Sequence, residues 1–408
     1  MKKLMILGAG EVQLHLINAA KEFDYFIIVC DMRSDTEAEK LADKFYKVNY
    51  MDKDAVLTIA KEEKIDGIIS NSEPAMISVA FVATAMGLPG NSVESIETLL
   101  SKSRFRDLQQ RLGTYAPKHS IANSIDEILN ILKEMSFPVI IKPTQCSGTR
   151  GTTRLDVYDK TLIKDAFEAC KEFSRNGTVT VEEYIEMSSI RVNDADVFVL
   201  GDKFIWDGWL WEDRSPDTPM LPMTEIYPMA MPEVVKTEIR ENVENILRGA
   251  GVRHGEYNME SYYTPDGKLF VIEINPRQAG NYIPQLIEQH TGVSLTKLLV
   301  STAVGDMSYY EELKSFKRKH NYVTLQVVFA KESGKFKELF IDPRVERYVK
   351  WIDQKFEIGS IIDKGINAGE AIAYVDMQFD DYKTQQSITR DIEKYIYAKV
   401  DNGENTKL

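Results

Sequence analysis

Three polar side chains alternate with apolar residues in the run VIEINPR, at residues 271–277. Glu273, Asn275 and Arg277 occupy every second position, and the residues between them are typical of a buried strand. Because a strand points alternate side chains to opposite faces, these three groups would project from one side. Burying an acid, an amide and a guanidinium together is costly unless a charged ligand binds there. An ion pair between Glu273 and Arg277 is the purely structural alternative, but it leaves Asn275 without a role.

A second candidate site follows the apolar run FPVIIKP. Lys142 ends this predicted strand, and the glycine-containing loop 147–151 comes within ten residues. Backbone amides of such a loop can cradle phosphate oxygens, while a lysine supplies a point charge. The loop is not a Walker A motif, because the lysine precedes the glycines. The alternative to a phosphate-binding site is an ordinary surface loop that binds no ligand.

Two further segments carry acids. In TVTVEEYI a strand runs into Glu182, Glu183, Tyr184 and Ile185, which is either an ordinary sheet edge or a hinge that reads an adenine. Glu260 precedes Glu273 by thirteen residues, across a predicted hairpin. Antiparallel pairing can bring Glu260 beside Glu273 and Asn275. Two carboxylates and an amide suit Mg²⁺, which keeps waters and bridges substrate phosphates.

The composition excludes several classes of protein. The chain has 408 residues, 43% hydrophobic and 28% charged, which is ordinary for a soluble protein of two or three domains. A net charge of −13 argues against nucleic-acid binding, and no apolar run reaches the ~20 residues of a membrane span. Cys30, Cys146 and Cys170 form no paired framework. We expect a reduced, cytoplasmic protein without a signal peptide and without a membrane partner.

The elements that must position these residues fall into three segments. Residues 1–113 alternate strands and helices, which predicts a parallel, doubly wound sheet ending in a long helical region. The middle segment carries predicted hairpins at Gly201-Asp202 and at residues 265–267, with a helix over 233–250. The last segment, from about 320, holds short strands and a final helix over 385–400.

The first glycine turn allows a different function. Gly8-Ala9-Gly10 follows the first predicted strand, and Asp31 closes the second, as in dinucleotide-binding sites. Gln13 replaces the third glycine of that fingerprint. The alternatives are an NAD-dependent oxidoreductase or a pair of glycines that only permit a tight turn. No later segment supplies hydride-transfer chemistry.

Lys142 with its glycine loop, the EEYI run, Glu260 and the ENPR-like run at 273–277 resemble, in order and spacing, the ATP-grasp superfamily. The resemblance covers nearly the whole chain. It implies an α/β fold with three parts: a Rossmann-like domain (1–113), a two-lobed ATP-grasp domain (114–318, small lobe about 118–186) and a small α+β domain (319–408). It also implies that the first glycine turn faces an acceptor substrate and not NAD.

The resemblance assigns roles to individual residues. Glu260, Glu273 and Asn275 would bind Mg²⁺, with Mn²⁺ as a substitute, and Arg277 would stabilise the charge that develops on an acyl phosphate. ATP would contact the following residues: Lys102, Lys142, Ser147, Gly148, Thr149, Gly151, Glu182, Glu183, Tyr184 and Ile185. Family members commonly have a glutamate for the ribose seven or eight residues beyond the hinge. Ser189 and Ile190 stand there instead, so Asp194 takes this assignment.

The implied reaction is ATP-dependent activation of a carboxylate, followed by attack of an amine. The run NPRQAGNYIPQLIEQHTGVSL resembles amino-acid (dipeptide-forming) ligases, so small-molecule carboxylate and amine substrates are expected. Purine-pathway and carboxylase-like enzymes of the same superfamily remain alternatives, as does a nucleotide-binding module without turnover. A homodimer is expected only because dimers are the commonest assembly.

The run WDGWLWEDRSPDTP is rich in aromatic residues. Trp206, Trp209 and Trp211 alternate imperfectly, so at least one is expected in the core. Asp213 and Arg214 follow, and they either line the acceptor site or belong to a loop beside core tryptophans.

Overall fold

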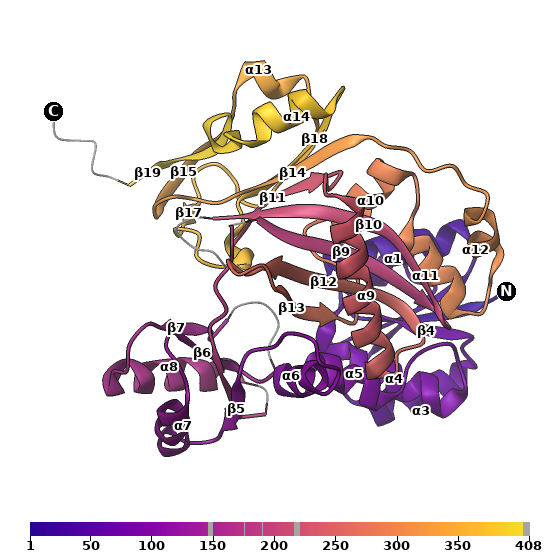
Figure 1. The fold of residues 1–408 in the computed structure, drawn as a ribbon. Coiled ribbons are helices and arrows are strands. Elements are labelled where there is room, and N and C mark those ends of the chain that lie inside the picture. Colours follow the sequence, from indigo (N-terminus) through magenta and orange to yellow (C-terminus); the bar gives the residue numbers. More distant parts are fainter. Residues whose placement is uncertain (146–149, 175, 190, 216–220, 403–408) are drawn as a thin grey trace.

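The computed structural model describes residues 1–145, 150–174, 176–189, 191–215 and 221–402 (Figure 1). The predicted phosphate-loop residues Ser147, Gly148 and Thr149 lie outside these ranges. Helices and strands alternate in the first part of the chain, and long antiparallel strands dominate the rest. None of the described helices is long and apolar enough to cross a membrane.

The amino-terminal segment forms a four-stranded sheet in the order β3-β2-β1-β4. All three strand pairs are parallel, as predicted. Its elements are β1 (Lys3–Leu7), α1 (Glu11–Glu22), β2 (Phe26–Asp31), α2 (Glu37–Leu41), β3 (Lys44–Lys47), α3 (Lys53–Glu63), β4 (Gly67–Ile69), the 3₁₀ helix Glu73–Ala75 and α4 (Met76–Met86).

The long helical region that follows is two helices, α5 (Val93–Leu100) and α6 (Lys102–Arg111). Ser101 separates them in an extended conformation, and its hydroxyl accepts a hydrogen bond from the amide of Arg104. A serine in this position satisfies an amide that the first turn of a helix leaves unpaired. The break places Lys102 at the beginning of α6, beside the small lobe and the large sheet.

The small lobe is an antiparallel sheet in the order β5-β8-β6-β7, with α7 and α8 packed on it. It extends away from the rest of the molecule, as Figure 1 shows. Its elements are β5 (His119–Ala122), α7 (Ile125–Ile131), the 3₁₀ helix Leu132–Glu134, β6 (Val139–Pro143), β7 (Thr153–Leu155), α8 (Lys160–Phe173) and β8 (Val179–Glu183).

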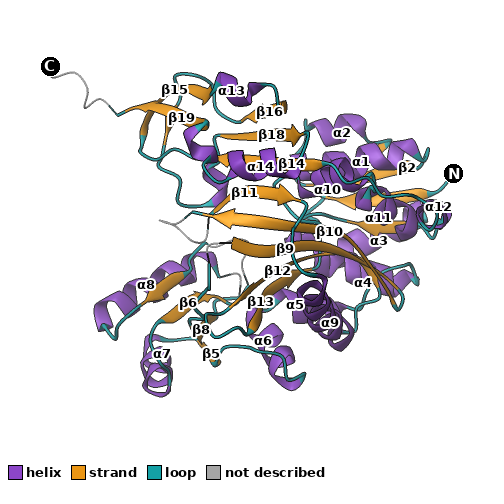
Figure 2. Ribbon diagram, turned by 45° about the horizontal axis from the view of Figure 1, so that its top comes forward, coloured by secondary structure: helices purple, strands orange, loops and turns teal. Residues whose placement is uncertain are grey.

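An antiparallel sheet of eight strands forms the centre of the molecule, in the order β13-β12-β9-β10-β11-β14-β18-β16. Apolar residues of α9 pack on one face, while α10, α11 and the amino-terminal segment pack on the other (Figure 2). The elements are β9 (Arg191–Leu200), β10 (Lys203–Arg214), β11 (Pro222–Tyr227), α9 (Glu233–Ala250), β12 (His254–Tyr263), β13 (Leu269–Asn275), α10 (Ile283–Thr291), α11 (Leu295–Ala303), α12 (Ser308–Leu313), β14 (Tyr322–Val328), β16 (Val349–Gln354) and β18 (Ala373–Phe379). The predicted helix 233–250 and both predicted hairpins are confirmed.

The last segment does not stand apart from the second, because β14, β18 and β16 continue the large sheet. A three-stranded sheet, β17-β15-β19, lies beside them. The remaining elements are β15 (Gly334–Ile341), α13 (Pro343–Glu346), β17 (Ile361–Ile362), the 3₁₀ helices Ala368–Glu370 and Ile392–Lys394, α14 (Tyr382–Thr389) and β19 (Ile396–Asp401).

The predicted final helix over 385–400 is wrong in its second half. Helix α14 ends at Thr389, and residues 396–401 form β19, which pairs with β15. Ile396, Ala398 and Val400 alternate with polar or exposed neighbours and contact apolar clusters of this segment. This period of two is the strand pattern, and the partner strand decides the outcome.

Candidate functional site

A small pocket lies where α6, β6 and β13 meet. Four residues predicted to bind ATP or metal line it, namely Lys102, Lys142, Glu273 and Asn275. Its volume of about 30 Å³ is enough for a water molecule but not for a triphosphate.

Lys142 forms a buried ion pair with Glu182 on the adjacent strand β8. The other oxygen of Glu182 accepts a hydrogen bond of 3.2 Å from Nε of Arg106 on α6. All three side chains are at least nine-tenths buried, with exposed fractions of 8%, 6% and 2% for Lys142, Glu182 and Arg106. Arg106 also donates to Gln109, whose amide donates to the carbonyl of Val271 on β13. Glu182 therefore connects the small lobe to α6, and through it to the large sheet.

The charges of this group shift the pKa values of its members. Burial lowers the pKa of Lys142 to about 8, against the opposing effect of Glu182. Burial alone would raise the pKa of Glu182, but Lys142 and Arg106 outweigh it and lower that pKa to about 2. At neutral pH the group holds two cations and one anion, so it has a surplus positive charge. The negative charge of a phosphate group would neutralise this surplus.

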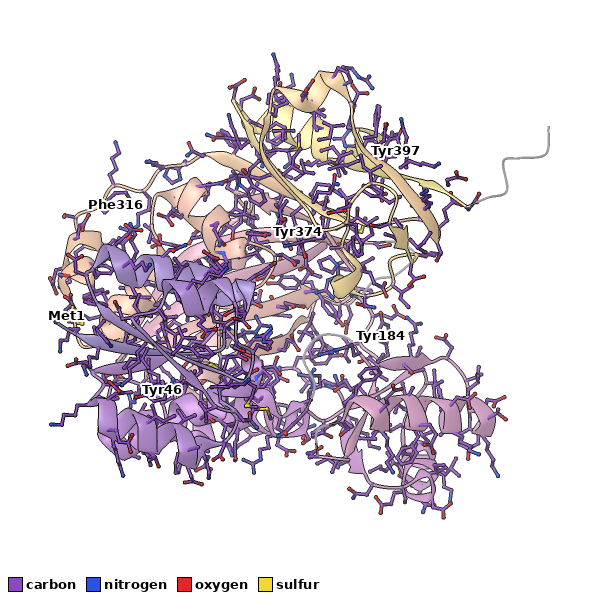
Figure 3. The ribbon with its side chains drawn as sticks, turned by 180° about the vertical axis from the view of Figure 1, so that it is seen from behind. Met1, Tyr46, Tyr184, Phe316, Tyr374 and Tyr397 are labelled. Carbon is purple, nitrogen blue, oxygen red and sulfur yellow. The ribbon has the colours of Figure 1, made fainter. Side chains whose placement is uncertain are left out.

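Hydrogen bonds connect the predicted hinge, residues 182–185, to neighbouring segments. Oε1 of Glu183 accepts a hydrogen bond from the amide of Ser136 (2.8 Å), and the carbonyl of Ile185 accepts one from the Tyr262 hydroxyl (2.6 Å). Tyr184 lies where the small lobe meets the rest of the molecule, as its label in Figure 3 shows. The guanidinium of Arg154 covers its ring at 4.1 Å. Protein groups therefore engage at least one oxygen of each hinge carboxylate, and a contact of either carboxylate with an adenine amino group stays a prediction.

Gly151 has a structural reason to be glycine. Its φ is +70°, and a Cβ atom there would lie 3.0 Å from the carbonyl of Ala169 on α8. Close packing against α8 therefore explains this residue without a phosphate.

The three predicted metal ligands come together at the edge of the large sheet. Glu260 on β12 lies directly opposite Glu273 on β13, as the hairpin predicted, and Asn275 donates to Oε1 of Glu273 (2.8 Å). Oε2 of Glu260 accepts a hydrogen bond of 2.5 Å from Nη2 of Arg214. Among the described residues, no three carboxylate, histidine or cysteine side chains form a ligand cluster by themselves. Two carboxylates and an amide fit Mg²⁺, which takes its remaining ligands from water and phosphate.

The two carboxylates have different proton affinities. Burial raises the pKa of Glu260 to about 7, with Glu212 and Glu273 adding to the effect and Arg214 opposing it. For Glu273, burial is outweighed by Lys102, by the hydrogen bond from Asn275 and by Arg277, so its pKa is lowered. Glu273 is therefore ready to bind a cation at neutral pH, and Glu260 becomes so as its proton leaves.

Arg277 lies just beyond the end of β13. Its amide donates to the carbonyl of Asn275, and its carbonyl accepts from the amide of Asn258. The next residue, Gln278, is 1% exposed, and its side chain has hydrogen bonds with four others, those of His15 on α1, Asn71 after β4, Glu256 on β12 and Thr296 on α11. These contacts fix the turn that carries Arg277 against the amino-terminal segment.

Asp194 does not lie along the pocket that Lys142 lines. It is buried within the large sheet, opposite Glu260, and it accepts a hydrogen bond from Nδ2 of Asn258 (2.7 Å). Burial, then the charges of Glu212 and Glu260, raise its pKa well above the ordinary value. It lies next to Glu260 on the neighbouring strand β9, and its contact with a ribose stays a prediction.

Sequence reasoning missed three residues of this region, Arg106, Glu212 and Glu225. Arg106 lies on the face of α6 that also buries Phe105, so a charged residue among buried helix positions was the available signal. Glu212 and Glu225 are buried on β10 and β11. Only the pairing of β10 with β11 shows that these two acids lie opposite each other.

Side chains of the chain itself lie against the amino-terminal glycine turn. The side chain of Gln13 is buried against Gly8, where a Cβ atom would lie 3.0 Å from its Cδ. The carboxylate of Asp31 accepts from the amide of Ala9 (2.7 Å) and from Arg33 (2.9 Å). Asp31, the residue that would bind a ribose in a dinucleotide site, therefore already accepts hydrogen bonds from neighbouring residues of its own chain.

The aromatic run lies on β10. Trp209 is buried in the cluster under α9 and stacks on Trp206 with ring centroids 4.7 Å apart. A register shift between Ile205 and Gly208 explains the imperfect alternation. Asp213 pairs with Arg191, while Arg214 joins Glu212 and Glu260. Only Arg214 of this pair joins the candidate site.

The chain is similar to several known proteins. Residues 101–204 match the family model described as "Carbamoyl-phosphate synthase L chain, ATP binding domain". The carbamoyl phosphate synthase large chain of Clostridium acetobutylicum is 25% identical in an alignment 392 residues long that covers 90% of this chain. The chain spans only 35% of the length of that relative.

Solved structures share the fold at low identity. An L-amino acid ligase from Bacillus licheniformis is similar over 98% of this chain and 99% of its own, with a TM-score of 0.81 and 17% identity. A phosphoribosylglycinamide synthetase from Anaerococcus prevotii covers 98% of this chain and 100% of its own, with a TM-score of 0.74 and 19% identity.

Proposed function

We propose that the chain is a protein of the ATP-grasp superfamily and that it acts as a carboxylate–amine ligase; its similarity to the ATP-binding domain of carbamoyl-phosphate synthase and to an L-amino acid ligase supports this proposal. The observation that carries the proposal is the pocket in which Lys102 and Lys142 face Glu273 and Asn275. Cations for phosphates and oxygen ligands for Mg²⁺ meet there from three separate elements. A site built in this way suits transfer of the terminal phosphoryl group of ATP.

In the proposed reaction, a carboxylate oxygen of the first substrate attacks the γ-phosphorus of ATP, and the bond to the ADP oxygen breaks. The nitrogen of an amine then attacks the carbonyl carbon of the acyl phosphate. The bond between that carbon and the phosphate oxygen breaks, phosphate leaves, and the nitrogen gives up a proton. The products are ADP, phosphate and an amide.

The chain's own residues have distinct roles in this scheme. Lys102 and Lys142 bind the phosphates, while Glu260, Glu273 and Asn275 hold Mg²⁺, which neutralises charge on the phosphates when bound. Arg277 stabilises the negative charge that develops as phosphate is transferred and as the tetrahedral intermediate forms. Gln278 orients the turn that carries Arg277.

Amino acids are the proposed substrates. The fold shared with an L-amino acid ligase, including its extent over 98% of this chain, supports this choice. A purine-pathway ligase is the second candidate, favoured by the equally complete match to phosphoribosylglycinamide synthetase. A carboxylase-like enzyme of the superfamily would use bicarbonate as its carboxylate.

Phosphate release from MgATP tests the proposal. The assay would use amino acids alone and in pairs, with bicarbonate and phosphoribosylamine as further arms and Glu273→Gln as the inactive control. We expect release that requires a particular amino-acid pair and disappears in the variant. Release with bicarbonate alone, or with phosphoribosylamine and glycine, would replace the amino-acid assignment by one of the alternatives. Release that persists in Glu273→Gln would contradict the assigned site.

A further inference from the structure

Buried acidic side chains continue across the large sheet beyond the predicted metal ligands. Glu225 on β11 lies directly opposite Glu212 on β10. Arg214 donates to Glu212 (2.5 Å) and to Glu260 (2.5 Å), so one guanidinium serves two carboxylates. Glu225 makes no ion pair with any other described residue in this structure.

Glu225 has an unused hydrogen-bonding atom in a fully buried position. Its exposed fraction is 0%, and its Oε2 has no hydrogen-bond partner within the described ranges. Its Oε1 accepts one long hydrogen bond of 3.4 Å from Asn281. Burial, and next the charge of Glu212, raise the pKa of Glu225 well above the ordinary value. A buried carboxylate in this state is costly unless a proton or a cationic ligand joins it.

The surroundings of Glu225 suit a cation. The turn 280–282 follows Arg277, and a Cβ atom at the exposed Gly280 would meet no atom within 4 Å. Tyr282 packs edge-on against Trp351 and Tyr374, with ring centroids 5.0 and 5.3 Å apart. Tyr374 lies on β18, which β14 separates from β11, and the ammonium group of Lys355 lies 5.9 Å from the centroid of its ring. Carboxylates beside aromatic rings bind ammonium and guanidinium groups.

Other charged groups border this region. Lys355 pairs with Asp353 (2.6 Å) and with Glu11 of α1 (2.9 Å), and the Tyr282 hydroxyl donates to Asp353. Lys355 is therefore neutralised by its own partners. Arg214 pairs with Glu212 and with Glu260, and neither ion pair includes Glu225.

The distance from the metal ligands limits what can bind. Glu260 lies on β12, and β9 and β10 separate this strand from β11. At about 4.8 Å per strand, the backbones of Glu260 and Glu225 are about 14 Å apart. A cation at Glu225 is therefore several bonds away from a group that reacts beside Glu260 and Glu273.

We propose that Glu225, together with Glu212, binds an ammonium or guanidinium group that one substrate carries several bonds from its reacting group. The proposal rests on the ligase function proposed above and defines its substrate class. Amino acids with cationic side chains, such as arginine or lysine, have this form. Binding would give Glu225 the partner that it lacks.

Thermal unfolding with matched ligand pairs tests this subsite. The probes are L-arginine against L-citrulline and L-lysine against L-norleucine, each added to the full chain with MgADP. We expect at least one cationic member to raise the Tm above its neutral partner. Glu225→Gln should abolish that difference and weaken binding of the cationic member at least tenfold by calorimetry.

The variant and its control separate a binding role from a structural one. Gln is neutral and similar in shape, so Glu225→Gln should fold and show a higher Tm than wild type without ligands. Asp376→Asn is the matched control, because Asp376 is a buried carboxylate of β18 with its own unpartnered Oδ1. This control should keep the preference for the cationic probe.

Two results would overturn the subsite. One is equal Tm values with cationic and neutral partners in wild type, for both pairs. The other is an unchanged preference in Glu225→Gln. The Tm shift caused by MgADP alone reports separately on the nucleotide site, so its absence would contradict the ligase proposal and not the subsite.

Discussion

Glu260 and Glu273 face each other across the β12–β13 hairpin, and their pKa values are shifted in opposite directions. The lysine and arginine side chains near Glu273 favour its ionised form, whereas burial favours the protonated form of Glu260. The proposed metal site therefore combines one carboxylate that is ionised at neutral pH with a second whose ionisation changes near pH 7.

Mg²⁺ binding should become weaker as the pH falls below about 7. Because the pKa of Glu260 is raised to about 7, a proton competes with the metal below that value, and affinity should fall by up to tenfold per pH unit. Calorimetric titration of Mg²⁺ with ADP present, at pH 6, 7 and 8, measures this. Glu260→Gln should bind weakly with a flat pH profile, and an equally steep profile in that variant would contradict the assignment.

The same shift predicts a pH dependence of stability without metal. The folded pKa of Glu260 lies above the unfolded value of about 4.3, so folding takes up a proton between these values. Its contribution is fully present below about pH 4.3 and is lost as the pH rises through 7. Comparison of urea unfolding for wild type and Glu260→Gln at pH 5 and 8 should show that the substitution is relatively more stabilising at pH 8. A difference that is the same at both pH values would argue that Glu260 keeps an ordinary pKa.

Replacing Glu182 with Gln should destabilise the protein by about 3 kcal/mol, since Lys142 and Arg106 would keep buried charges without their shared anion. Urea unfolding monitored by tryptophan fluorescence gives this value. MgATP should restore part of the loss, because its phosphates supply negative charge to Lys142. Exposed Glu233→Gln is the control, and a similarly small effect of both substitutions would show that the buried group is not what holds the lobe.

Arg277→Met should lower kcat by a factor of 10² to 10³ while the Kd for MgADP changes little. The reason is that charge builds up beside Arg277 during the reaction and not in the bound nucleotide. Steady-state kinetics and calorimetry separate the two effects. Arg248→Met, at an exposed ion pair on α9, should leave both unchanged. A loss of MgADP affinity equal to the loss of kcat would make Arg277 a nucleotide-binding residue.

NAD should not bind. Gln13 fills the glycine turn and Asp31 is engaged by Ala9 and Arg33, so MgATP should raise the Tm and NAD should not. Differential scanning fluorimetry decides between them. A shift with NAD that Asp31→Asn removes would revive the oxidoreductase alternative.

Much of the fold could be predicted because the alternation of side chains and the turn residues within single segments specify its hairpins. The alternation around Glu273 and the short turn before it specify a hairpin, and the hairpin specifies that Glu260 faces Glu273. The alternation of side chains from Ile396 onward also indicates a strand. It follows directly after a helical pattern, so the predicted helix was extended over it. Boundaries that depend on a partner strand, as for β19 with β15, cannot be read from one segment.

The remaining parts of the site depend on contacts between distant segments. The contact of Glu182 with adenine stays a prediction, and the hydrogen bond that its carboxylate accepts from Arg106, 76 residues earlier, could not be predicted from either segment. Glu225 was unremarkable in the run MTEIY until the pairing of β11 with β10 placed it opposite Glu212. Contacts of this kind join separate helices and strands, so they cannot be predicted from the pattern of either segment alone.

The most direct test of the central claim follows an oxygen atom. The carboxylate substrate identified by phosphate release would be labelled with ¹⁸O in both oxygens and turned over with MgATP and the amine. If the carboxylate attacks the γ-phosphorus, each phosphate released carries one ¹⁸O atom from the substrate, which mass spectrometry detects. Unlabelled phosphate, accompanied by amide formation, would contradict an acyl phosphate and with it the proposed mechanism.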